Sequence, residues 1–251
     1  NSGNMQRYII FGHKEDQASH NRYGLLLQIG ELNGSASVVV KKRESRKEVY
    51  PNVGDYSTIK VLAGKRGKLK LSLTYDVAVT EQVGEKADGT PKFKTKTKKV
   101  VAEPPTVDSL TKLVVYTWKL PDTTSNIKIS MSGRNEIYAI SVDGAYGIAV
   151  DNVAMRGSSG TIFHKVDNEL LAECYKAMNV KLIMMEYGGN MVPTMSAKTV
   201  DWSRKLITRQ IHAIQKANPD ADILFIGPAH MEKQIGGRWQ TYSGLSLAIK
   251  M

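Results

Sequence analysis

Cysteine and long apolar runs are both scarce in this chain of 251 residues. The single cysteine, Cys174, excludes an internal disulfide and a cysteine-rich zinc site. The spacing of the apolar residues around it predicts a helix with Cys174 on the buried face. No apolar run approaches the roughly 20 residues of a membrane-spanning helix, so no membrane span is expected.

Acidic residues are outnumbered by basic ones, 24 against 35, which gives a net charge of +11. Such an excess occurs in proteins that neutralise nucleic-acid phosphates. The densest cluster, Lys92, Lys94, Lys96 and Lys98, repeats at every second residue, which predicts one face of a strand. Exposed strand lysines commonly prevent edge-to-edge association, so a solvated strand is the preferred interpretation. A surface for an anionic polysaccharide or cell-envelope polymer is the second interpretation, and nucleic acid, the third, is not expected as a partner.

The first part of the chain, residues 1–144, has short apolar or alternating runs separated by Gly, Asn, Asp and Pro. This spacing predicts an all-β module, a sandwich or jelly roll. Asn33-Gly34 and Asp88-Gly89 are predicted hairpin turns, because both dipeptides accept positive φ. Residues 81–99 are predicted to form a long hairpin or a mobile loop.

The pattern changes in residues 145–251. Strands are predicted at 145–155, 180–187 and 221–227, and helices at 167–178, 200–218 and 242–251. Strands that are apolar on both faces and alternate with helices predict a parallel sheet covered on both sides. We therefore expect part of a three-layer, flavodoxin-like α/β domain, with its site at the carboxyl ends of the strands.

Two glycine-bearing turns follow predicted strands, one at residues 155–160 and one at Tyr187-Gly188-Gly189-Asn190. Glycine lets a backbone N–H approach a ligand closely, and the asparagine amide offers a second donor, so together they could form an oxyanion hole. For either turn alone, the simpler alternative is that its glycines only end a strand and begin a helix.

The order of these features resembles the central part of SGNH (GDSL-like) esterases and acylhydrolases. Within that superfamily it is most similar to bacterial envelope or secreted carbohydrate esterases that carry an extra β-sandwich. The resemblance covers about Gly147 to Met251, with Gly157 matching the glycine of the second block and Gly188-Gly189-Asn190 the third block. It implies that Gly157 and Asn190 supply oxyanion-hole donors. The region before it matches the accessory, carbohydrate-binding module of these esterases only by its position in the chain and by its pattern of short predicted strands.

Two blocks of the SGNH pattern are not found. No Gly-Asp-Ser occurs, the nearest segment being Phe11-Gly12-His13-Lys14, and no Asp-x-x-His follows the last predicted strand. Either the chain is a piece of a longer protein or it is a diverged relative that has lost catalysis. The first explanation is preferred, because the last predicted helix reaches Ile249-Lys250-Met251 without a stop signal. A sheet that lacks its first strand exposes an edge, so a second segment or chain is expected to complete it.

An alternative nucleophile lies beside Gly157, at Ser158 or Ser159. The sequence Gly-Ser-Ser-Gly does not fit the Gly-x-Ser-x-Gly elbow, and a catalytic serine also needs a base within hydrogen-bond reach. His230 is the best local base, although a structural or substrate-lining role is preferred for it.

The remaining candidates concern substrate. Arg156 could bind a substrate carboxylate or cap a carbonyl, and Trp239, in a predicted loop with Tyr242, could stack on a sugar ring or pack under the loop. The predicted substrate-binding residues are Gly188, Gly189, Ser158, Arg156, His230 and Trp239. The histidines have no zinc-motif spacing, so no metal and no cofactor is expected.

The resemblance implies a serine esterase that removes acyl groups, such as acetyl, from a polysaccharide or peptidoglycan-like polymer. The serine would lie outside these residues, so this chain alone is expected to be inactive. The implied location is secreted, periplasmic or at the cell surface. The alternative is a non-catalytic glycan-binding protein with a degenerate SGNH scaffold.

Overall fold

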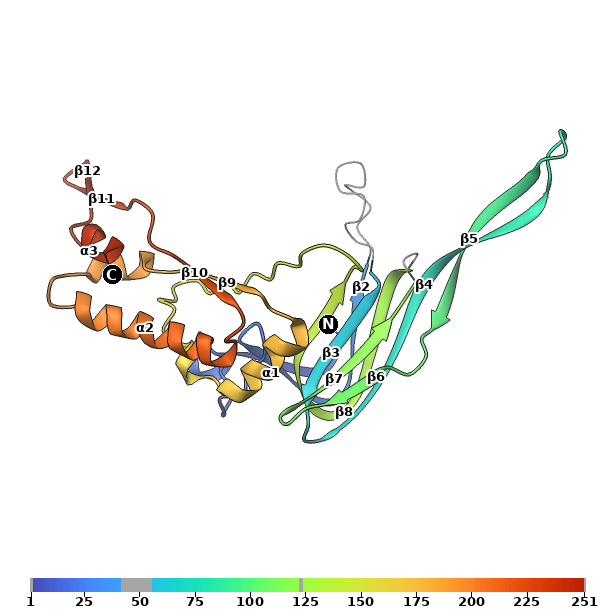
Figure 1. The fold of residues 1–251 in the computed structure, drawn as a ribbon, viewed down its shortest axis with the longest axis horizontal. Coiled ribbons are helices and arrows are strands. Elements are labelled where there is room, and N and C mark those ends of the chain that lie inside the picture. Colours follow the sequence, from blue (N-terminus) through green and yellow to red (C-terminus); the bar gives the residue numbers. More distant parts are fainter. Residues whose placement is uncertain (1, 42–55, 122–123, 251) are drawn as a thin grey trace. The chain divides into compact units, whose positions relative to one another are not determined.

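The computed structural model describes residues 2–41, 56–121 and 124–250, and the chain divides into two compact units (Figure 1). Unit 1 comprises Asn1–Tyr8 and Ile29–Asp151, and unit 2 comprises Ile9–Gln28 and Asn152–Met251. The sequence pattern predicted a single boundary near residue 144, whereas the second unit also contains Ile9–Gln28 from near the start of the chain.

Unit 1 is built on one eight-stranded sheet with antiparallel pairing. Its strands are β1 (Ser2–Ile9), β2 (Gln28–Val40), β3 (Thr58–Gly64), β4 (Lys68–Glu85), β5 (Pro91–Val101), β6 (Thr106–Ser109), β7 (Leu113–Lys119) and β8 (Thr124–Asp143). The 20-residue strand β8 is central, because it pairs with β2, β3 and β4. The β4–β5 hairpin extends beyond the rest of the sheet (Figure 1).

The core of unit 1 lies on one face of β2, β4 and β8. Along β8, Ile127, Ile129 and Met131 are buried and alternate with residues that are not, as the period of two in a strand requires. These side chains pack with apolar residues of β2, β3, β4 and β7 in a single cluster. The opposite face of β2, β4 and β8 carries the alternate, largely polar residues.

One of the two predicted turns is confirmed. Asp88-Gly89 connects β4 and β5, where the Gly89 N–H donates to the Lys86 carbonyl and the Thr90 N–H to Asp88 Oδ1. The prediction for Asn33-Gly34 is wrong, because this dipeptide lies inside β2 and pairs with β8. The ladder with a long neighbouring strand prevails over the local turn preference.

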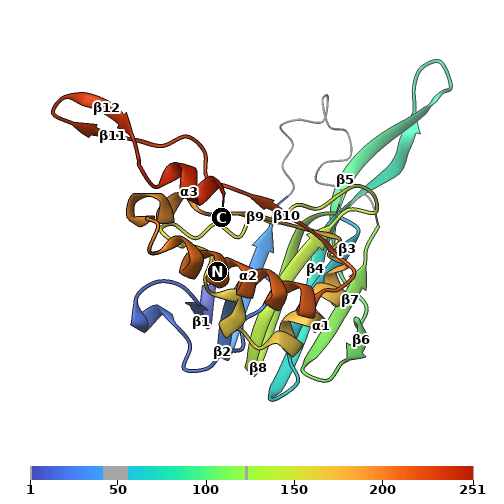
Figure 2. The same cartoon turned by 60° about the vertical axis from the view of Figure 1, so that its left-hand side comes forward.

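Unit 2 contains three α-helices and two small sheets in the part of the chain that is described. Its elements include α1 (Asn168–Met178), β9 (Leu182–Glu186), α2 (Val200–Ala217), β10 (Asp222–Ile226), β11 (Glu232–Ile235), β12 (Arg238–Thr241) and α3 (Leu245–Ile249). β9 and β10 form a two-stranded parallel sheet, and β11 and β12 an antiparallel hairpin. α1 and α2 lie side by side, and the β11–β12 hairpin extends away from them (Figure 2).

Local signals explain where α1 begins and ends. Asp167 caps α1, its Oδ1 accepting the Leu170 N–H at 3.1 Å, and Asn179 ends the helix in the left-handed conformation. Cys174 is buried on the apolar face of α1, which confirms the prediction for it. The last predicted helix is present as α3, although Met251 lies outside the described residues. No helix in the described ranges has the combined length and apolarity of a membrane span.

The expected fold class is wrong. Unit 1 is one continuous sheet instead of a two-sheet sandwich or jelly roll, and unit 2 has a two-stranded parallel sheet instead of a three-layer, flavodoxin-like α/β fold. Residues 145–155, predicted to be a strand, have no regular structure, and Tyr146, Ile148 and Val150 are exposed. An alternating apolar pattern forms a strand only where a neighbouring strand accepts its backbone hydrogen bonds, and no described strand does so here.

β9 and β10 were expected to be buried on both faces. Met185 is buried, but Leu182, Met184, Leu224 and Ile226 on the opposite face are each 40–55% exposed. The apolar runs therefore predicted the strands β9 and β10 correctly. They did not predict that one face of this two-stranded sheet is left uncovered.

Candidate functional site

A hydrogen bond joins the two glycine-bearing turns of unit 2. Asn190, which follows β9, donates from Nδ2 to the Ser158 carbonyl at 2.9 Å. Asn190 is exposed, and no described residue accepts the second hydrogen of its amide. Gly157 is also exposed, and its N–H donates to no described residue. The structure thus brings the two turns together through Asn190 and Ser158, the neighbour of Gly157.

Tyr187 holds the first turn against the end of β9. A Cβ placed on Gly160 would lie 2.6 Å from Tyr187 Cγ, so the Gly160 backbone packs directly against the ring and leaves no room for a side chain. Phe163 contacts the same ring edge-on, with the ring centroids 6.5 Å apart. Burial raises the pKa of the Tyr187 phenol, which favours its neutral form. The 155–160 turn is therefore fixed by aromatic packing as well as by the Asn190 hydrogen bond.

A third segment, the irregular residues 227–231 directly after β10, lies beside the second turn. The Tyr187 N–H donates to the Ile226 carbonyl at 3.2 Å, and a Cβ on Gly188 would lie 2.9 Å from Pro228 Cδ. A Cβ on Gly189 would lie 3.8 Å from Met231 Sδ. Residues 155–160, 187–190 and 227–231, here called the turn cluster, thus gather at the carboxyl ends of β9 and β10, where ligands commonly bind in parallel sheets.

The turn cluster does not assemble a serine–histidine pair. The Ser158 side chain is buried, and its Oγ accepts the Gly160 N–H at 3.1 Å, so this hydroxyl belongs to the turn. His230 is exposed and its Nε2 lies 3.1 Å from Glu232 Oε1. Within the described residues, no hydrogen bond joins His230 to Ser158 or Ser159.

The two remaining predicted substrate residues are peripheral. Arg156 is exposed at the edge of the first turn and has no ion pair with a described residue. Trp239 is exposed on β12, opposite Gln234 of β11. The β11–β12 hairpin is attached to the turn cluster by the Tyr242 N–H, which donates to the Met231 carbonyl at 3.2 Å. Trp239 itself makes no hydrogen bond or ring contact with the cluster in the described structure.

One supporting residue was not identified from the sequence. Gln210 of α2 is fully buried and its Oε1 accepts the His164 N–H at 3.2 Å, while its Nε2 lies 2.8 Å from His164 Nδ1. These bonds tie the segment after the first turn to α2. The available signal was a polar residue on the apolar stripe of a helix, between Ile207 and Ile214.

The turn cluster offers hydrogen-bond donors in place of a metal-binding set. No group of three His, Cys, Asp or Glu side chains suited to a metal ion occurs within residues 2–41, 56–121 and 124–250. Cys174 lies apart from the cluster in α1, where burial raises the pKa of its thiol to about 12 and leaves it protonated at neutral pH. No family model matches the chain, and no curated protein matches its sequence. Its chemistry is therefore inferred from the geometry of the turn cluster.

Proposed function

We propose that the turn cluster stabilises the tetrahedral oxyanion formed when an acyl ester on a carbohydrate is hydrolysed. The observation that carries the proposal is the 2.9 Å hydrogen bond from Asn190 to the Ser158 carbonyl, because it holds the amide beside the Gly157 turn and leaves its second hydrogen for a ligand. Donors fixed in advance stabilise developing charge without reorganisation. Loss of one such donor typically lowers kcat about 100- to 1000-fold.

The proposed reaction is acyl transfer to a serine and then to water. A general base takes the proton of a serine hydroxyl as its Oγ bonds to the ester carbonyl carbon, the carbonyl electron pair moves onto oxygen, and Gly157 and Asn190 donate to that oxyanion. The oxyanion then collapses and the C–O bond to the sugar breaks, while the protonated base returns the serine proton to the sugar oxygen. Water hydrolyses the acyl-serine and releases a carboxylate. In this proposal the serine comes from outside the 251 residues, since the Ser158 hydroxyl is buried and bonded within its turn.

The proposed substrate class is an acylated, for example acetylated, polysaccharide or peptidoglycan-like polymer, met in a secreted, periplasmic or cell-surface setting. This part rests on the resemblance of the two turns to SGNH esterases. The mechanism requires neither a metal nor an organic cofactor.

Because this proposal places the serine outside the 251 residues, its test uses a full-length form that carries such a serine. With p-nitrophenyl acetate and acetylated xylan as substrates, we expect Asn190→Ala to lower kcat about 100-fold with a smaller change in KM. The control is Asn152→Ala, which removes an exposed asparagine of the same unit and is expected to leave kcat unchanged. Full activity of Asn190→Ala would contradict the proposed role.

The position of the nucleophile is tested separately. A serine-directed phosphonate is expected to inactivate the full-length protein, and the 251 residues alone are expected to hydrolyse p-nitrophenyl acetate no faster than buffer. Phosphonate-sensitive turnover by these residues alone would show that the serine lies within them.

The lack of a serine–histidine pair in the described turn cluster also favours a second candidate, a non-catalytic glycan-binding protein. The two functions differ in one outcome. If the full-length protein retains acetylated xylan on an affinity gel but releases no acetate from it, the binding function replaces the esterase.

A further inference from the structure

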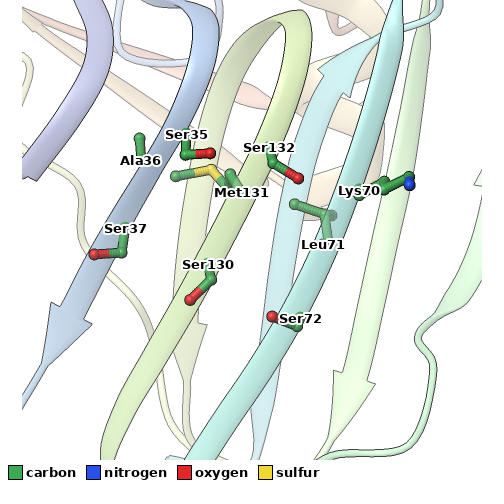
Figure 3. Close-up of a pocket in the computed structure, with 9 residues that line it drawn as sticks. All are labelled: Ser35, Ala36, Ser37, Lys70, Leu71, Ser72, Ser130, Met131 and Ser132. Atoms are coloured by element: carbon green, nitrogen blue, oxygen red, sulfur yellow. The ribbon is translucent and has the colours of Figure 1, made fainter.

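A row of hydroxyl groups crosses three strands of unit 1 on the face opposite its core. The strand registers place Ser132 of β8 between Ser35 of β2 and Lys70 of β4, and Ser130 of β8 between Ser37 and Ser72. Figure 3 shows these two cross-strand rows, which line a hollow of about 420 Å³. The serine face is defined by Ser35, Ser37, Lys70, Ser72, Ser130 and Ser132.

The alternation of the strands explains why these side chains share a face. Ala36 and Met131, which alternate with the serines of β2 and β8, are buried in the core, and Leu71 of β4 packs against it. Because successive side chains of a strand point to opposite faces, the serines and Lys70 point away from the core.

Most of the hydroxyls on the serine face have no partner among the described residues. The side-chain hydroxyls of Ser35, Ser72, Ser130 and Ser132 make no hydrogen bond with any residue in the described part of the chain. Each serine hydroxyl can donate one hydrogen bond and accept two. Neighbouring strands are about 4.8 Å apart and side chains on one face repeat about every 7 Å, so the two rows form an open grid of hydrogen-bonding groups.

The same face is positively charged. Next to the row of Ser132, Arg134 of β8 pairs with Lys68 of β4. Next to the row of Ser130, on the other side, Lys128 of β8 pairs with Thr74 of β4. With Lys70 these make four cations, and none forms an ion pair with a described residue. Arg134 lies opposite Asn33 of β2. The next row on this face is acidic, because Glu31 of β2 lies opposite Glu136 of β8, and the positive stretch ends there.

We infer that the serine face binds an anionic polysaccharide, such as a polyuronate. Lys68, Lys70, Lys128 and Arg134 are placed to neutralise carboxylate or sulfate groups along the polymer, while the serines exchange hydrogen bonds with sugar hydroxyls. The four rows span about 20 Å, which suits a polymer segment better than a single ion. Single-stranded nucleic acid is bound mainly through aromatic stacking platforms, and these rows contain no aromatic residue. The inference concerns unit 1 and does not depend on ester hydrolysis by unit 2.

Binding of soluble polygalacturonate to the 251-residue chain tests the inference, measured by affinity gel electrophoresis and biolayer interferometry. The triple variant Lys68→Gln, Lys70→Gln, Lys128→Gln is expected to weaken binding at least about tenfold. The matched control is Lys92→Gln, Lys94→Gln, Lys98→Gln on β5, which removes the same charge from exposed lysines away from the serine face. We expect the control to change the affinity by about twofold or less.

A second variant separates the hydroxyls from the charges. Ser72→Ala with Ser130→Ala removes two facing hydroxyls and is expected to weaken binding about fivefold while leaving the salt dependence unchanged. Four results would each overturn the inference: no retention by polygalacturonate, equal losses in the two triple variants, wild-type affinity in the serine variant, or equally tight binding of single-stranded DNA. Thermal melting of each variant verifies that the fold is retained.

Discussion

Gly157 and Gly160 have the same backbone conformation in very different surroundings. Both have positive φ, +81° and +74°, a region that disfavours residues with a side chain. A Cβ on Gly160 would meet the Tyr187 ring at 2.6 Å, whereas a Cβ on Gly157 would meet nothing within 4 Å. One glycine is therefore required by packing and backbone together, and the other by its backbone alone.

This difference predicts unequal effects of alanine at the two positions. Gly160→Ala is expected to lower the free energy of unfolding by about 3 kcal/mol, because strain at positive φ adds to a clash with the half-buried Tyr187 ring. Gly157→Ala serves as the control and is expected to lower it by about 1 kcal/mol from strain alone. Urea unfolding followed by circular dichroism measures both. Equal losses would mean that the Tyr187 contact does not define the turn.

At the scale of the element, α1 shows how one side chain determines where a helix begins. The Asp167 carboxylate accepts the Leu170 N–H, and its negative charge also lies at the positive end of the helix dipole. Leu170, Leu171 and Cys174 then bury the apolar face of the helix. Because α1 packs on α2, the cap stabilises the helical part of unit 2.

Asp167→Ala is expected to destabilise unit 2 by about 1 kcal/mol, the usual contribution of an N-cap side chain. Asp167→Ser keeps a capping oxygen and should recover most of that loss. The shift in thermal midpoint, followed by circular dichroism at 222 nm, compares the two variants. A serine variant as unstable as the alanine variant would show that another interaction of Asp167, and not the cap, is responsible.

At the scale of the whole molecule, the two-stranded sheet of unit 2 leaves an apolar surface exposed. Leu182, Met184, Leu224 and Ile226 lie on one face of β9 and β10, each at least 40% exposed. Contiguous apolar surface and unpaired strand edges favour association with other chains. This property concerns the assembly of the protein and not the chemistry of the turn cluster.

We expect the chain to self-associate through this surface at high concentration. Met184→Lys with Leu224→Glu places opposite charges on neighbouring positions of β9 and β10 and should shift the protein toward the monomer in sedimentation velocity. The control, Val83→Lys with Phe93→Glu, changes two exposed apolar residues of the β4–β5 hairpin. If both double variants behave like the wild type, the β9–β10 surface is not responsible for association.

The sequence by itself determined the features that depend on a few neighbouring residues. The helices α1 and α2, the strands β9 and β10, the Asp88-Gly89 turn and the burial of Cys174 all follow from periodicity and turn preference. Residue type and order also singled out the Gly157 and Asn190 turns, whose role stays a prediction, but did not predict the hydrogen bond that joins the turns.

Only the tertiary structure decided which strands pair and in which register. It placed Asn33-Gly34 inside β2, left residues 145–155 without a strand partner, and limited the parallel sheet to β9 and β10. It also aligned Ser35, Ser132 and Lys70, which are far apart in the sequence, into one row. The physical reason is that strand pairing depends on hydrogen bonds between distant segments, and a shift of one residue would turn every side chain to the other face.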